Sequence, residues 1–555
     1  MRPTLETARA ALKRYFGYPD FRAGQVDVIA SVLEGADTLG VLPTGGGKSL
    51  CFQVPALVLP GVTVVISPLI SLMKDQVDRL VGLGIPATFL NSTLEPAEGA
   101  RRLESVRRGV VRLLYVAPER FRNPAVLDAL ATGGIGFLAV DEAHCISEWG
   151  HEFRPSFRCI ADAASLFDAL QVVALTATAT PAVRSDIVAQ LRMRHPRVIV
   201  GGFDRPNLSY AVRRCSSPTQ KREALHALLR AEPGLAVVYA STRSEVSRVT
   251  RELNRARITA SAYHGGLPHR HRLDAQDAFM RERVRAIVAT NAFGMGVDKP
   301  NVRLVVHHAM PGTLEAYYQE AGRAGRDGEP GRCVLLYGAD DRRTHEFFIR
   351  GTFPAADTVR RVLGTLREMA EGARIPSDPG AIARRASVTP TEVAAVLRWL
   401  ERAGVIRRGG THGAVHVRLM ALPSRIAAEL PPSSPERRVL RALWRRAGAA
   451  LLDGVLLAPP QPPLHTLRAL RARQFVDFES DADAAWLVSP APPLEAALAR
   501  LGRRRAAETA KLDRMVEYAE TARCRRATVL AYFGERRSSA PCTGCDNCQT
   551  ASVTA

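Results

Sequence analysis

The first 340 residues alternate short apolar runs rich in β-branched side chains with longer segments of helical periodicity. This alternation predicts parallel sheets covered by helices, because two parallel strands need a helical crossover between them. The rhythm pauses at Phe203-Asp204-Arg205-Pro206 and then restarts, so we predict two consecutive α/β domains, residues 1–205 and 206–340. The expected strands are 62–67, 112–117, 135–140, 171–175 and 197–201 in the first domain, and 235–240, 259–263, 285–290, 302–307 and 332–337 in the second.

Beyond residue 340 the strand rhythm stops. Residues 379–419 have the pattern of a helix, a turn and a second helix, followed by two short strands around Gly409, Gly410 and Gly413, which is the element order of a winged helix. Residues 435–489 repeat this pattern, with helices near 435–447 and 463–473 and a hairpin in FVDFES-DADA-AWLVS. We therefore predict winged-helix-like α+β units at 341–425 and 426–492, followed by a helical module at 493–550.

The chain is strongly basic, with 76 Lys and Arg, 55 Asp and Glu, and a formal net charge of +21. Such a field indicates a polyanionic partner, nucleic acid before an anionic membrane surface. Only 6 of the basic residues are Lys, an imbalance typical of GC-rich coding, so part of this charge need not serve a function. Residues 341–555 hold 34 basic and 22 acidic residues, a net +12 against +9 for the rest, and we expect more of the nucleic-acid contacts there.

The start of the chain has scattered charges and lacks the uninterrupted apolar run of a secretory signal. Residues 51–73 form a stretch of 23 residues without a charge. Pro55, Pro60 and Pro68 interrupt it, and a spanning helix so broken would leave backbone groups unsatisfied in lipid. The sequence therefore predicts a cytoplasmic protein without a membrane partner.

A glycine-rich run, LPTGGGKS at residues 42–49, follows an apolar stretch and precedes a helix-compatible segment. This is the context of a phosphate-binding loop, whose backbone N–H groups surround the phosphates while its Lys and Ser contact the β/γ-phosphates and Mg²⁺. Because Leu42 breaks the strict G-x-x-x-x-G-K-[ST] pattern, an ordinary glycine-rich turn is the alternative. The residues that we predict to bind ATP are Thr44, Gly45, Gly46, Gly47, Lys48 and Ser49, with Ser49 also on Mg²⁺.

Two carboxylates, Asp141 and Glu142, follow the predicted strand 135–140, and Ala143 and His144 complete the segment. Acidic residues at the carboxyl end of a parallel strand face the ligand crevice. We predict that Asp141 acts on Mg²⁺, that Glu142 orients and activates the attacking water, and that His144 belongs to the same catalytic segment. A carboxylate pair is also common in surface turns, but its order after the glycine-rich loop favours a nucleotide site.

The second α/β domain contains Gln319, Arg323 and Arg326 within the run QEAGRAGRD. Phosphoryl transfer concentrates negative charge on the γ-phosphate oxygens, and an Arg from a neighbouring domain stabilises that charge. In so Arg-rich a chain, the alternative is a salt-bridged surface helix. We predict that these three residues complete the catalytic set.

Four of the nine cysteines, Cys524, Cys542, Cys545 and Cys548, fall near the C-terminus with the spacing C-x17-C-x2-C-x2-C. Four thiolates complete a tetrahedral Zn²⁺ site that is closed and therefore structural. A disulfide pair is the alternative, and a cytosolic location disfavours it. We predict one bound zinc ion in the module at 493–550.

Residues 12–340 carry an ordered motif set that resembles superfamily 2 helicases, and specifically the RecQ family of DNA helicases. The C-terminal segments CRRATVLAYFGE and CTGCDNC are similar to the zinc module of that family. The motifs are FGYPDFRAGQ (16–25), LPTGGGKS, SPLISLMKDQV (67–77), DEAH (141–144), CISEWGHEFRPSF (145–157), LTATAT (175–180), VVYASTRSEV (237–246), ATNAFGMGVDKPNVR (289–303) and YYQEAGRAGRDG (317–328).

The resemblance implies roles for further residues at the nucleotide site. It makes Tyr18 the ring that stacks on adenine, while Arg22 and Gln25 read the edge of the base. Gly296 and Asp298 lie in the segment that lines the cleft from the second domain.

It also implies how hydrolysis is coupled to DNA. Residues 176–178 become the motif that couples hydrolysis to strand movement. Arg326 becomes the arginine finger, with Arg323 as a second phosphate contact. The loop that senses single-stranded DNA contributes Trp149, Phe153 and Arg154.

One departure from the usual RecQ order is evident, because about 180 residues separate the last helicase motif from Cys524. The element that separates the strands is therefore left unassigned. The sequence predicts an ATP-dependent DNA helicase that moves 3′→5′ on single strands, opens forked or branched DNA in recombination or repair, and associates with the nucleoid. A DEAD/DEAH-type RNA helicase, or a DNA-binding regulator that uses ATP as a switch, remains as an alternative.

Overall fold

A computed structural model describes residues 3–68, 70–150, 153–167, 170–294, 299–370, 374–375, 379–408, 415–453, 455–457, 463–480, 485–488, 493–536 and 541–553. Contacts divide the chain into two compact units. Unit 1 comprises Met1–His345 and Ala510–Ala555, and unit 2 comprises Glu346–Thr509. Among the described residues, every helix is too short or too polar to cross a membrane.

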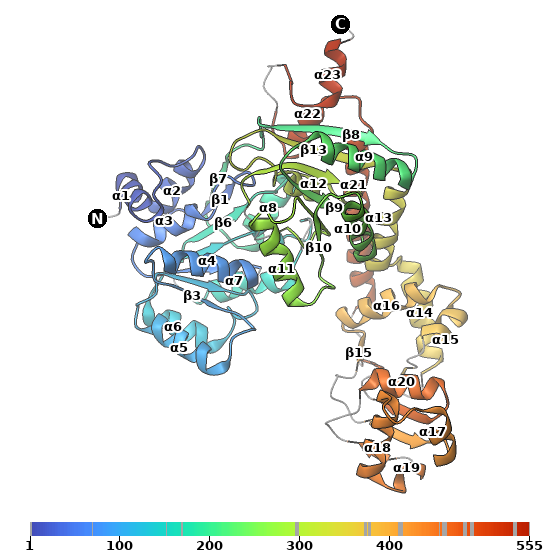
Figure 1. Cartoon of the computed structure of the whole chain (residues 1–555). Coiled ribbons are helices and arrows are strands. Elements are labelled where there is room, and N and C mark those ends of the chain that lie inside the picture. Colours follow the sequence, from blue (N-terminus) through green and yellow to red (C-terminus); the bar gives the residue numbers. More distant parts are fainter. Residues whose placement is uncertain are drawn as a thin grey trace. The chain divides into compact units, whose positions relative to one another are not determined.

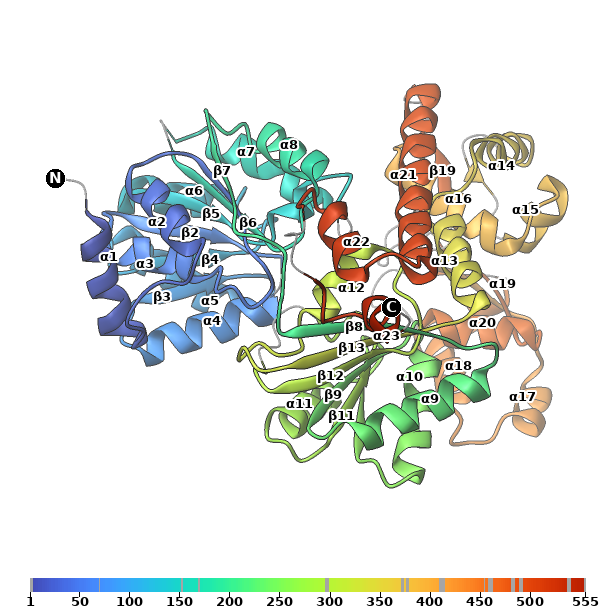
Figure 2. The ribbon, with the colours of Figure 1, turned by 90° about the horizontal axis from the view of Figure 1, so that it is seen from above.

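The first lobe of unit 1 is built on a parallel sheet in the order β3-β4-β2-β5-β6-β1-β7. Helices cover both faces of this sheet (Figures 1 and 2). Its strands are β1 (Thr38–Val41), β2 (Val62–Ile66), β3 (Ala87–Leu90), β4 (Leu113–Val116), β5 (Ile135–Val140), β6 (Val172–Thr176) and β7 (Arg197–Val200). Its helices are α1 (Leu5–Ala11), η1 (Leu12–Phe16), α2 (Gln25–Leu33), α3 (Leu50–Val58), α4 (Ile70–Gly82), α5 (Pro96–Arg107), α6 (Pro124–Gly133), η2 (Ala143–Ile146), η3 (Pro155–Arg158), α7 (Cys159–Ala164) and α8 (Pro181–Gln190).

The second lobe has a parallel sheet in the order β10-β11-β9-β12-β13-β8. Its core contains Leu225, Val238, Val249, Val306 and Val334, which come from helices and strands spread along the lobe. The strands are β8 (Leu208–Arg214), β9 (Leu235–Tyr239), β10 (Ala260–Tyr263), β11 (Ala286–Ala289), β12 (Val302–His307) and β13 (Gly331–Tyr337). The helices are α9 (Pro218–Ala231), α10 (Arg243–Arg255), α11 (His269–Met280), α12 (Leu314–Ala321) and α13 (Ala339–Thr352).

All ten predicted strands are confirmed to within one residue at each end, and the two α/β lobes with them. Three further strands, β1, β3 and β8, are additions to the prediction. β3 and β8 are edge strands, and β8 alternates buried and half-buried residues before two exposed Arg, a weaker pattern than a fully buried strand. β1 is the apolar stretch before the glycine-rich loop, and its four residues are all buried between β6 and the edge strand β7.

The C-terminal part of unit 1 consists of the end of α21 (Leu494–Glu520) from Ala510 onward, α22 (Arg525–Tyr532) and α23 (Asp546–Val553). The chain leaves unit 1 at the end of the second lobe and returns within α21. The returning segment packs on the lobe: Tyr337 donates a hydrogen bond to Glu520 at 2.8 Å, and Arg342 pairs with Asp513 at 2.8 Å. Figure 2 shows α22 and α23 beside β8. The predicted helical segment 494–520 is confirmed.

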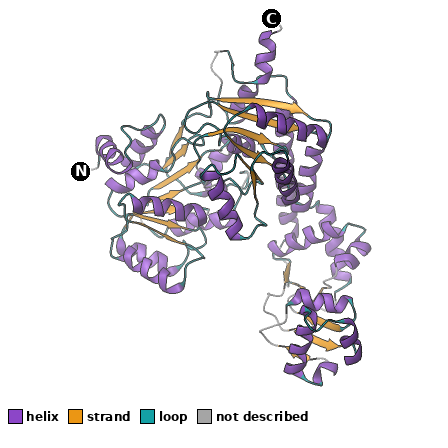
Figure 3. Ribbon diagram, viewed as in Figure 1, coloured by secondary structure: helices purple, strands orange, loops and turns teal. Residues whose placement is uncertain are grey.

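Unit 2 contains helices and two small antiparallel sheets (Figure 3). One sheet has the order β14-β19-β15, with β14 (Arg374–Ile375), β15 (Ile406–Arg408) and β19 (Ala485–Leu487). The other has the order β17-β16-β18, with β16 (Val415–Leu419), β17 (Val455–Leu457) and β18 (Val476–Ser480). The helices are α14 (Ala356–Glu368), α15 (Pro379–Ala386), α16 (Pro390–Arg402), α17 (Pro423–Glu429), α18 (Pro435–Ala447), α19 (Ala450–Asp453) and α20 (Leu464–Ala472).

The strands predicted in this unit are present, but the hairpin predicted in FVDFES-DADA-AWLVS is wrong, and the two strands predicted around Gly409 do not pair with each other. β15 pairs with β19 rather than with β16, and β18 pairs with β16 rather than with β19. Strands joined by a short loop pair readily because loop closure costs little, but here burial decides. Ile406 and Leu487 pack in one core, while Val417 and Phe478 pack in another. The body at 415–480 is therefore inserted between two strands of the first sheet, and the predicted boundary at 425 separates strands that share a sheet.

Candidate functional site

Unit 1 contains a cavity of about 680 Å³ that both lobes line. The first lobe contributes its glycine-rich loop and the residues that follow β5, and the second contributes residues from α11, α12 and the loop after α12. The predicted residues that the structure brings together here are Tyr18, Arg22, Gln25, Thr44, Gly45, Gly47, Lys48, Ser49, Asp141, Glu142, Gln319, Arg323 and Arg326.

The glycine-rich loop connects β1 to α3, the strand-to-helix position in which backbone N–H groups can face phosphates. Gly45 and Gly47 have φ of +81° and +73°, so both need the left-handed backbone that glycine adopts without strain. A Cβ on Gly46 would lie 2.9 Å from the Pro43 carbonyl oxygen. Three adjacent glycines are thus required by the loop's conformation, which supports a phosphate cradle rather than an ordinary turn.

The side chains of Gln25 and Arg22 both donate hydrogen bonds to the glycine-rich loop. The buried Gln25 side chain donates through Nε2 to the carbonyls of Gly46 and Gly47, at 3.1 and 2.9 Å, and accepts the Arg22 N–H at 2.8 Å. Arg22 Nη1 donates to the Gly45 carbonyl at 2.7 Å. Tyr18 lies nearby with 41% of its surface exposed, so its ring is accessible to a flat ligand. The contacts of Gln25 and Arg22 tie this segment to the backbone that would hold the phosphates.

The two carboxylates lie at the carboxyl end of β5, where the Asp141 N–H donates to the Ile66 carbonyl at 2.9 Å. Burial, with Glu142 beside it, raises the pKa of Asp141 to about 7, while Lys48 acts in the opposite direction. Burial likewise lowers the pKa of Lys48, against the attraction of Glu142 and Asp141. Glu142 has a left-handed φ of 49°, a conformation that costs free energy in a non-glycine residue. Such a cluster suits an anionic ligand with a divalent cation.

His144 does not face the cavity but lies fully buried beneath it. Its Nδ1 is 2.9 Å from the Thr176 hydroxyl and 3.4 Å from a Glu142 carboxylate oxygen. His144 therefore connects the carboxylate segment after β5 to the predicted coupling motif after β6. This placement gives it a linking position rather than direct contact with a ligand.

Gln319 lies on α12, and Arg323 and Arg326 lie in the turn that follows it. Arg326 comes close to the glycine-rich loop, since a Cβ on Gly45 would lie 3.4 Å from its Cγ. Arg323 is buried, at 5% exposure. Arg326 thus lies against the glycine-rich loop of the first lobe, and both Arg line the same cavity as that loop.

The aromatic-rich loop begins directly after η2. Trp149 is 40% exposed, and the Phe153 ring lies 5.3 Å from the Arg158 guanidinium carbon. Arg154 donates through Nη1 to the Pro68 carbonyl at 2.8 Å, so in this structure it braces the motif at 67–77. Trp149 is accordingly the loop residue whose ring is most open to a nucleic-acid base.

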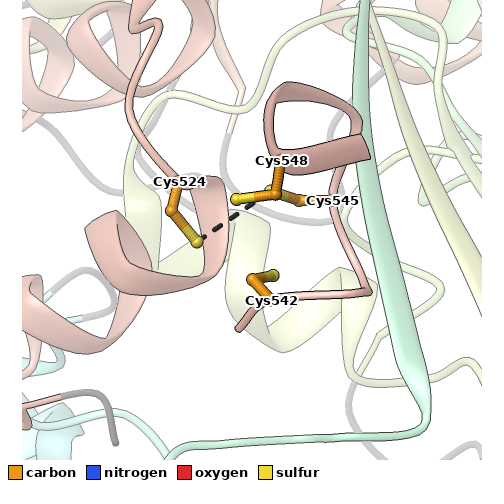
Figure 4. Close-up of side chains that lie close together, drawn as sticks. All are labelled: Cys524, Cys542, Cys545 and Cys548. Atoms are coloured by element: carbon orange, nitrogen blue, oxygen red, sulfur yellow. Dashed lines mark hydrogen bonds between the residues drawn. The ribbon is translucent and has the colours of Figure 1, made fainter. Parts of the chain in front are cut away.

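The four cysteines near the C-terminus converge on one point (Figure 4). Their sulfur atoms all lie within 4.8 Å of one another, and the Cys545 and Cys524 sulfurs are 3.9 Å apart. A tetrahedron with Zn–S bonds of 2.3 Å places sulfurs about 3.8 Å apart, so the donor set fits Zn²⁺. None of these four cysteines forms a disulfide. Cys524 precedes α22 and Cys548 lies on α23, so the site links the start of α22 to α23.

Two predicted site residues, Gly296 and Asp298, lie outside the described residues. Several cavity-lining residues were missed by sequence reasoning: Asp75, Gln76 and Arg79 on α4, Gln276 and Met280 on α11, and Asp327. The signal for Asp75 and Gln76 was available in the motif at 67–77, which predicts a functional segment without saying which side chains face the ligand. Arg79 lies two residues beyond that motif. α11 carries no such motif.

Three family models match the chain. They are the DEAD/DEAH box helicase over residues 22–186, the helicase conserved C-terminal domain over 220–328, and the RecQ zinc-binding model over 494–549. The last of these spans all four clustered cysteines.

Curated relatives agree with these models. The chain is 44% identical over 335 residues to the ATP-dependent DNA helicase RecQ of Pasteurella multocida (strain Pm70), which covers 60% of this chain and 53% of the relative. It is 39% identical over 362 residues to the probable ATP-dependent DNA helicase RecS of Bacillus subtilis (strain 168), which covers 65% of this chain and 73% of that relative. The chain spans between 53% and 58% of the length of the first three RecQ relatives.

A solved structure has the same fold. The DUF1998 helicase MrfA, in a crystal structure bound to DNA, matches with a TM-score of 0.51 and 17% identity over 73% of this chain and 58% of that chain. At 17% identity this likeness concerns the fold alone. The three family models, together with the match over 73% of the RecS relative, show that the chain belongs to the RecQ family of ATP-dependent DNA helicases.

Proposed function

We propose that this protein is an ATP-dependent DNA helicase that moves 3′→5′ along a single strand and opens forked or branched DNA. The observation that carries the proposal is the cavity lined by both lobes, in which a phosphate-binding loop and two carboxylates face two Arg. A site divided between two lobes can convert hydrolysis into relative motion, because the nucleotide contacts both.

Within this site, the loop N–H groups and Lys48 bind the phosphates, and Tyr18 stacks on the base. Ser49 and Asp141 would hold Mg²⁺, which supplies positive charge to the phosphate oxygens when bound. Glu142 orients the attacking water and accepts its proton. Arg326, with Arg323 beside it, stabilises the negative charge that develops on the γ-phosphate.

DNA sensing is proposed for the loop that contains Trp149 and Phe153. An exposed Trp ring offers a stacking surface of about 1–3 kcal/mol per base, independent of the base's identity. The loop is continuous with the carboxylate segment, and Ser147 ties it to α8 by donating to Asp186 at 2.6 Å. Movement of this loop on DNA binding would therefore reach Glu142 through a few residues.

The zinc-binding module would hold one structural Zn²⁺ through Cys524, Cys542, Cys545 and Cys548. Metal analysis of the purified protein by mass spectrometry should give about one zinc per chain. We further propose that the winged-helix-like parts of unit 2 contact the DNA backbone, because residues 346–509 hold 25 basic and 16 acidic residues, a net charge of +9. Association with the nucleoid follows from DNA binding.

The test is ATP hydrolysis measured without nucleic acid, with single-stranded DNA and with single-stranded RNA, using Lys48→Ala as the blank. Strong stimulation by DNA supports the proposal, and a strand-displacement assay on forked substrates with one labelled tail then gives the polarity. Hydrolysis that ignores DNA, or that responds to RNA instead, contradicts it.

A further inference from the structure

The segment that joins the two lobes, residues 203–208, follows β7 and leads into β8. In the sequence it only marks a domain boundary. In the structure, the half-buried side chain of Arg205 extends from this interlobe segment between the glycine-rich loop and the turn after α12. It thus touches both halves of the nucleotide site at their closest approach.

Arg205 donates four hydrogen bonds, all to main-chain carbonyl oxygens. Nη1 donates to Thr44 at 2.9 Å and to Gly322 at 3.3 Å, and Nη2 donates to Ala324 at 3.1 Å and to Gly325 at 2.9 Å. A guanidinium presents its donors in one rigid plane, so these bonds fix two backbones relative to each other. The contact depends on the position of the backbone and not on neighbouring side chains.

The glycine-rich loop and the turn after α12, which Arg205 connects, are closely packed against each other. A Cβ on Gly322 would lie 3.0 Å from Thr44 Cβ, and a Cβ on Gly45 would lie 3.4 Å from Arg326 Cγ. Because the loops are this close, a small shift in one changes the distance from Arg326 to a phosphate held by the other. Displacements near 1 Å are enough to slow an aligned reaction by about 100-fold.

The interlobe segment also fastens the turn after α12 through Asn207. Its Nδ2 donates to the carbonyls of Gly325 and Glu329, both at 2.8 Å. Gly325 has φ of +53°, and a Cβ there would lie 2.4 Å from the Glu329 oxygen. The hydrogen bonds of Asn207 therefore hold the turn that carries Arg326 against the interlobe segment.

The zinc-binding module holds this segment from the other side, beginning at Phe203. The Phe533 ring is stacked on Phe203, with centroids 4.4 Å apart and planes 9° from parallel. Glu535 accepts the Phe203 N–H at 2.5 Å, and the Tyr318 hydroxyl donates to the Phe203 carbonyl at 2.9 Å. Phe203 is 1% exposed.

Arg526, the second residue of α22, makes a further set of contacts with the segment. It donates through Nη1 to Asp204 at 2.7 Å and through Nη2 to the Leu208 carbonyl at 2.7 Å. The residue before Arg205 and the third residue after it are thus both bonded to the zinc-binding module. The backbone that carries Arg205 has little freedom while the module is folded.

We propose that Arg205 is a positioning residue for phosphoryl transfer, and that the zinc-binding module acts on ATP hydrolysis by holding residues 203–208 around it. The inference rests on the proposed ATPase function. Arg205 is absent from the described residues that line the cavity, so its effect falls on the alignment of Arg323 and Arg326 and not on nucleotide binding.

The first experiment compares Arg205→Gln and Arg205→Lys in the zinc-loaded full chain, with the exposed Arg213→Gln as the charge-matched control. Steady-state ATP hydrolysis is measured with saturating single-stranded DNA, and binding is measured with a fluorescent ADP analogue. Arg205→Gln should lower kcat about 10- to 100-fold and leave KM and the Kd of the analogue within about 3-fold. Arg205→Lys should recover part of kcat, since an ammonium can reach some of the same oxygens.

Two results would overturn the inference. One is a kcat for Arg205→Gln within about twofold of the Arg213→Gln control. The other is a parallel loss of kcat, nucleotide binding and bound zinc, which indicates a general folding defect. A wild-type protein without ATP hydrolysis would instead contradict the proposed function.

A double-mutant cycle tests the part assigned to the zinc-binding module. Glu535→Ala should lower kcat severalfold with zinc retained, whereas the exposed neighbour Arg536→Gln should not. If Glu535 acts through the interlobe segment, Glu535→Ala combined with Arg205→Gln should be no slower than Arg205→Gln alone. Losses that multiply would show that the module acts by another route.

Discussion

The two lobes of unit 1 are both parallel sheets covered by helices, yet they contribute different functional groups to one cavity. The first lobe supplies the loop whose N–H groups face phosphates, together with Lys48, Asp141 and Glu142. The second supplies Gln319 and the two cations Arg323 and Arg326. The shared topology provides edges at which loops meet, and the loop residues decide which reaction step each edge serves. We propose that the first lobe holds the nucleotide and that the second completes its hydrolysis.

The largest effect is expected at the first lobe. Lys48→Ala should reduce kcat/KM for ATP by at least about 10³-fold and also weaken nucleotide binding, because the cation contacts the phosphates before and during transfer. Steady-state hydrolysis and titration with a fluorescent ADP analogue measure both quantities. The exposed Lys13→Ala is the control. If Lys48→Ala binds the ADP analogue as tightly as the wild type does, the proposal that the first lobe holds the nucleotide is contradicted.

The corresponding change in the second lobe is Arg326→Ala. It should lower kcat by about 10³-fold while the Kd of the same analogue stays within about 3-fold, because the contact is made mainly in the transition state. The exposed Arg255→Ala, on the same lobe, should behave like the wild type. If Arg326→Ala binds nucleotide as poorly as Lys48→Ala, the second lobe has a share in holding the ground state.

A smaller effect is expected where the first lobe meets DNA. Trp149→Ala should leave the basal ATPase unchanged and raise the DNA concentration for half-maximal stimulation by about 10-fold, as expected for one lost stacking contact. Trp149→Phe keeps an aromatic face and should recover most of the stimulation. Equal losses of basal and stimulated rates would mean that Trp149 stabilises the fold rather than sensing DNA.

The smallest effect is expected where Tyr18 is proposed to stack on the adenine of ATP. Tyr18→Ala should raise KM for ATP about 2- to 10-fold with little change in kcat, since one aromatic contact contributes about 0.5–1.5 kcal/mol. Tyr18→Phe should be close to wild type, because the ring and not the hydroxyl makes the contact. A loss of kcat in Tyr18→Ala without a change in KM would contradict stacking on the nucleotide.

Predictability differs between the lobes and unit 2 for a physical reason. In the lobes, most of the parallel strands are buried, continuous apolar runs, so ten strands could be placed to within one residue. In unit 2 the strands are short and only partly buried, and nothing local indicates that β15 pairs with β19 across an inserted body. The pairing depends on which of two cores receives Ile406, and that is a non-local choice.

Residues at the nucleotide site show the same division. Lys48, Asp141 and Arg326 stand in motifs whose spacing reveals their chemistry. Arg205 stands in a connection that carries no motif. Its side chain donates to four backbone carbonyl oxygens, and the residue types around it do not predict such contacts. Its position could be found only once the two loops were seen on either side of it.

For this protein, the order of apolar runs, the glycine-rich loop, the carboxylate pair and the cysteine spacing already specify two α/β lobes, a nucleotide site and a zinc site. These features are local, because a strand, a phosphate-binding turn or a set of four thiolates is encoded by nearby residues. Which loops of the two lobes meet, how the zinc-binding module holds residues 203–208, and how unit 2 pairs its strands come from packing between distant segments. Those contacts depend on shape and burial in the folded chain, so only the tertiary structure decides them.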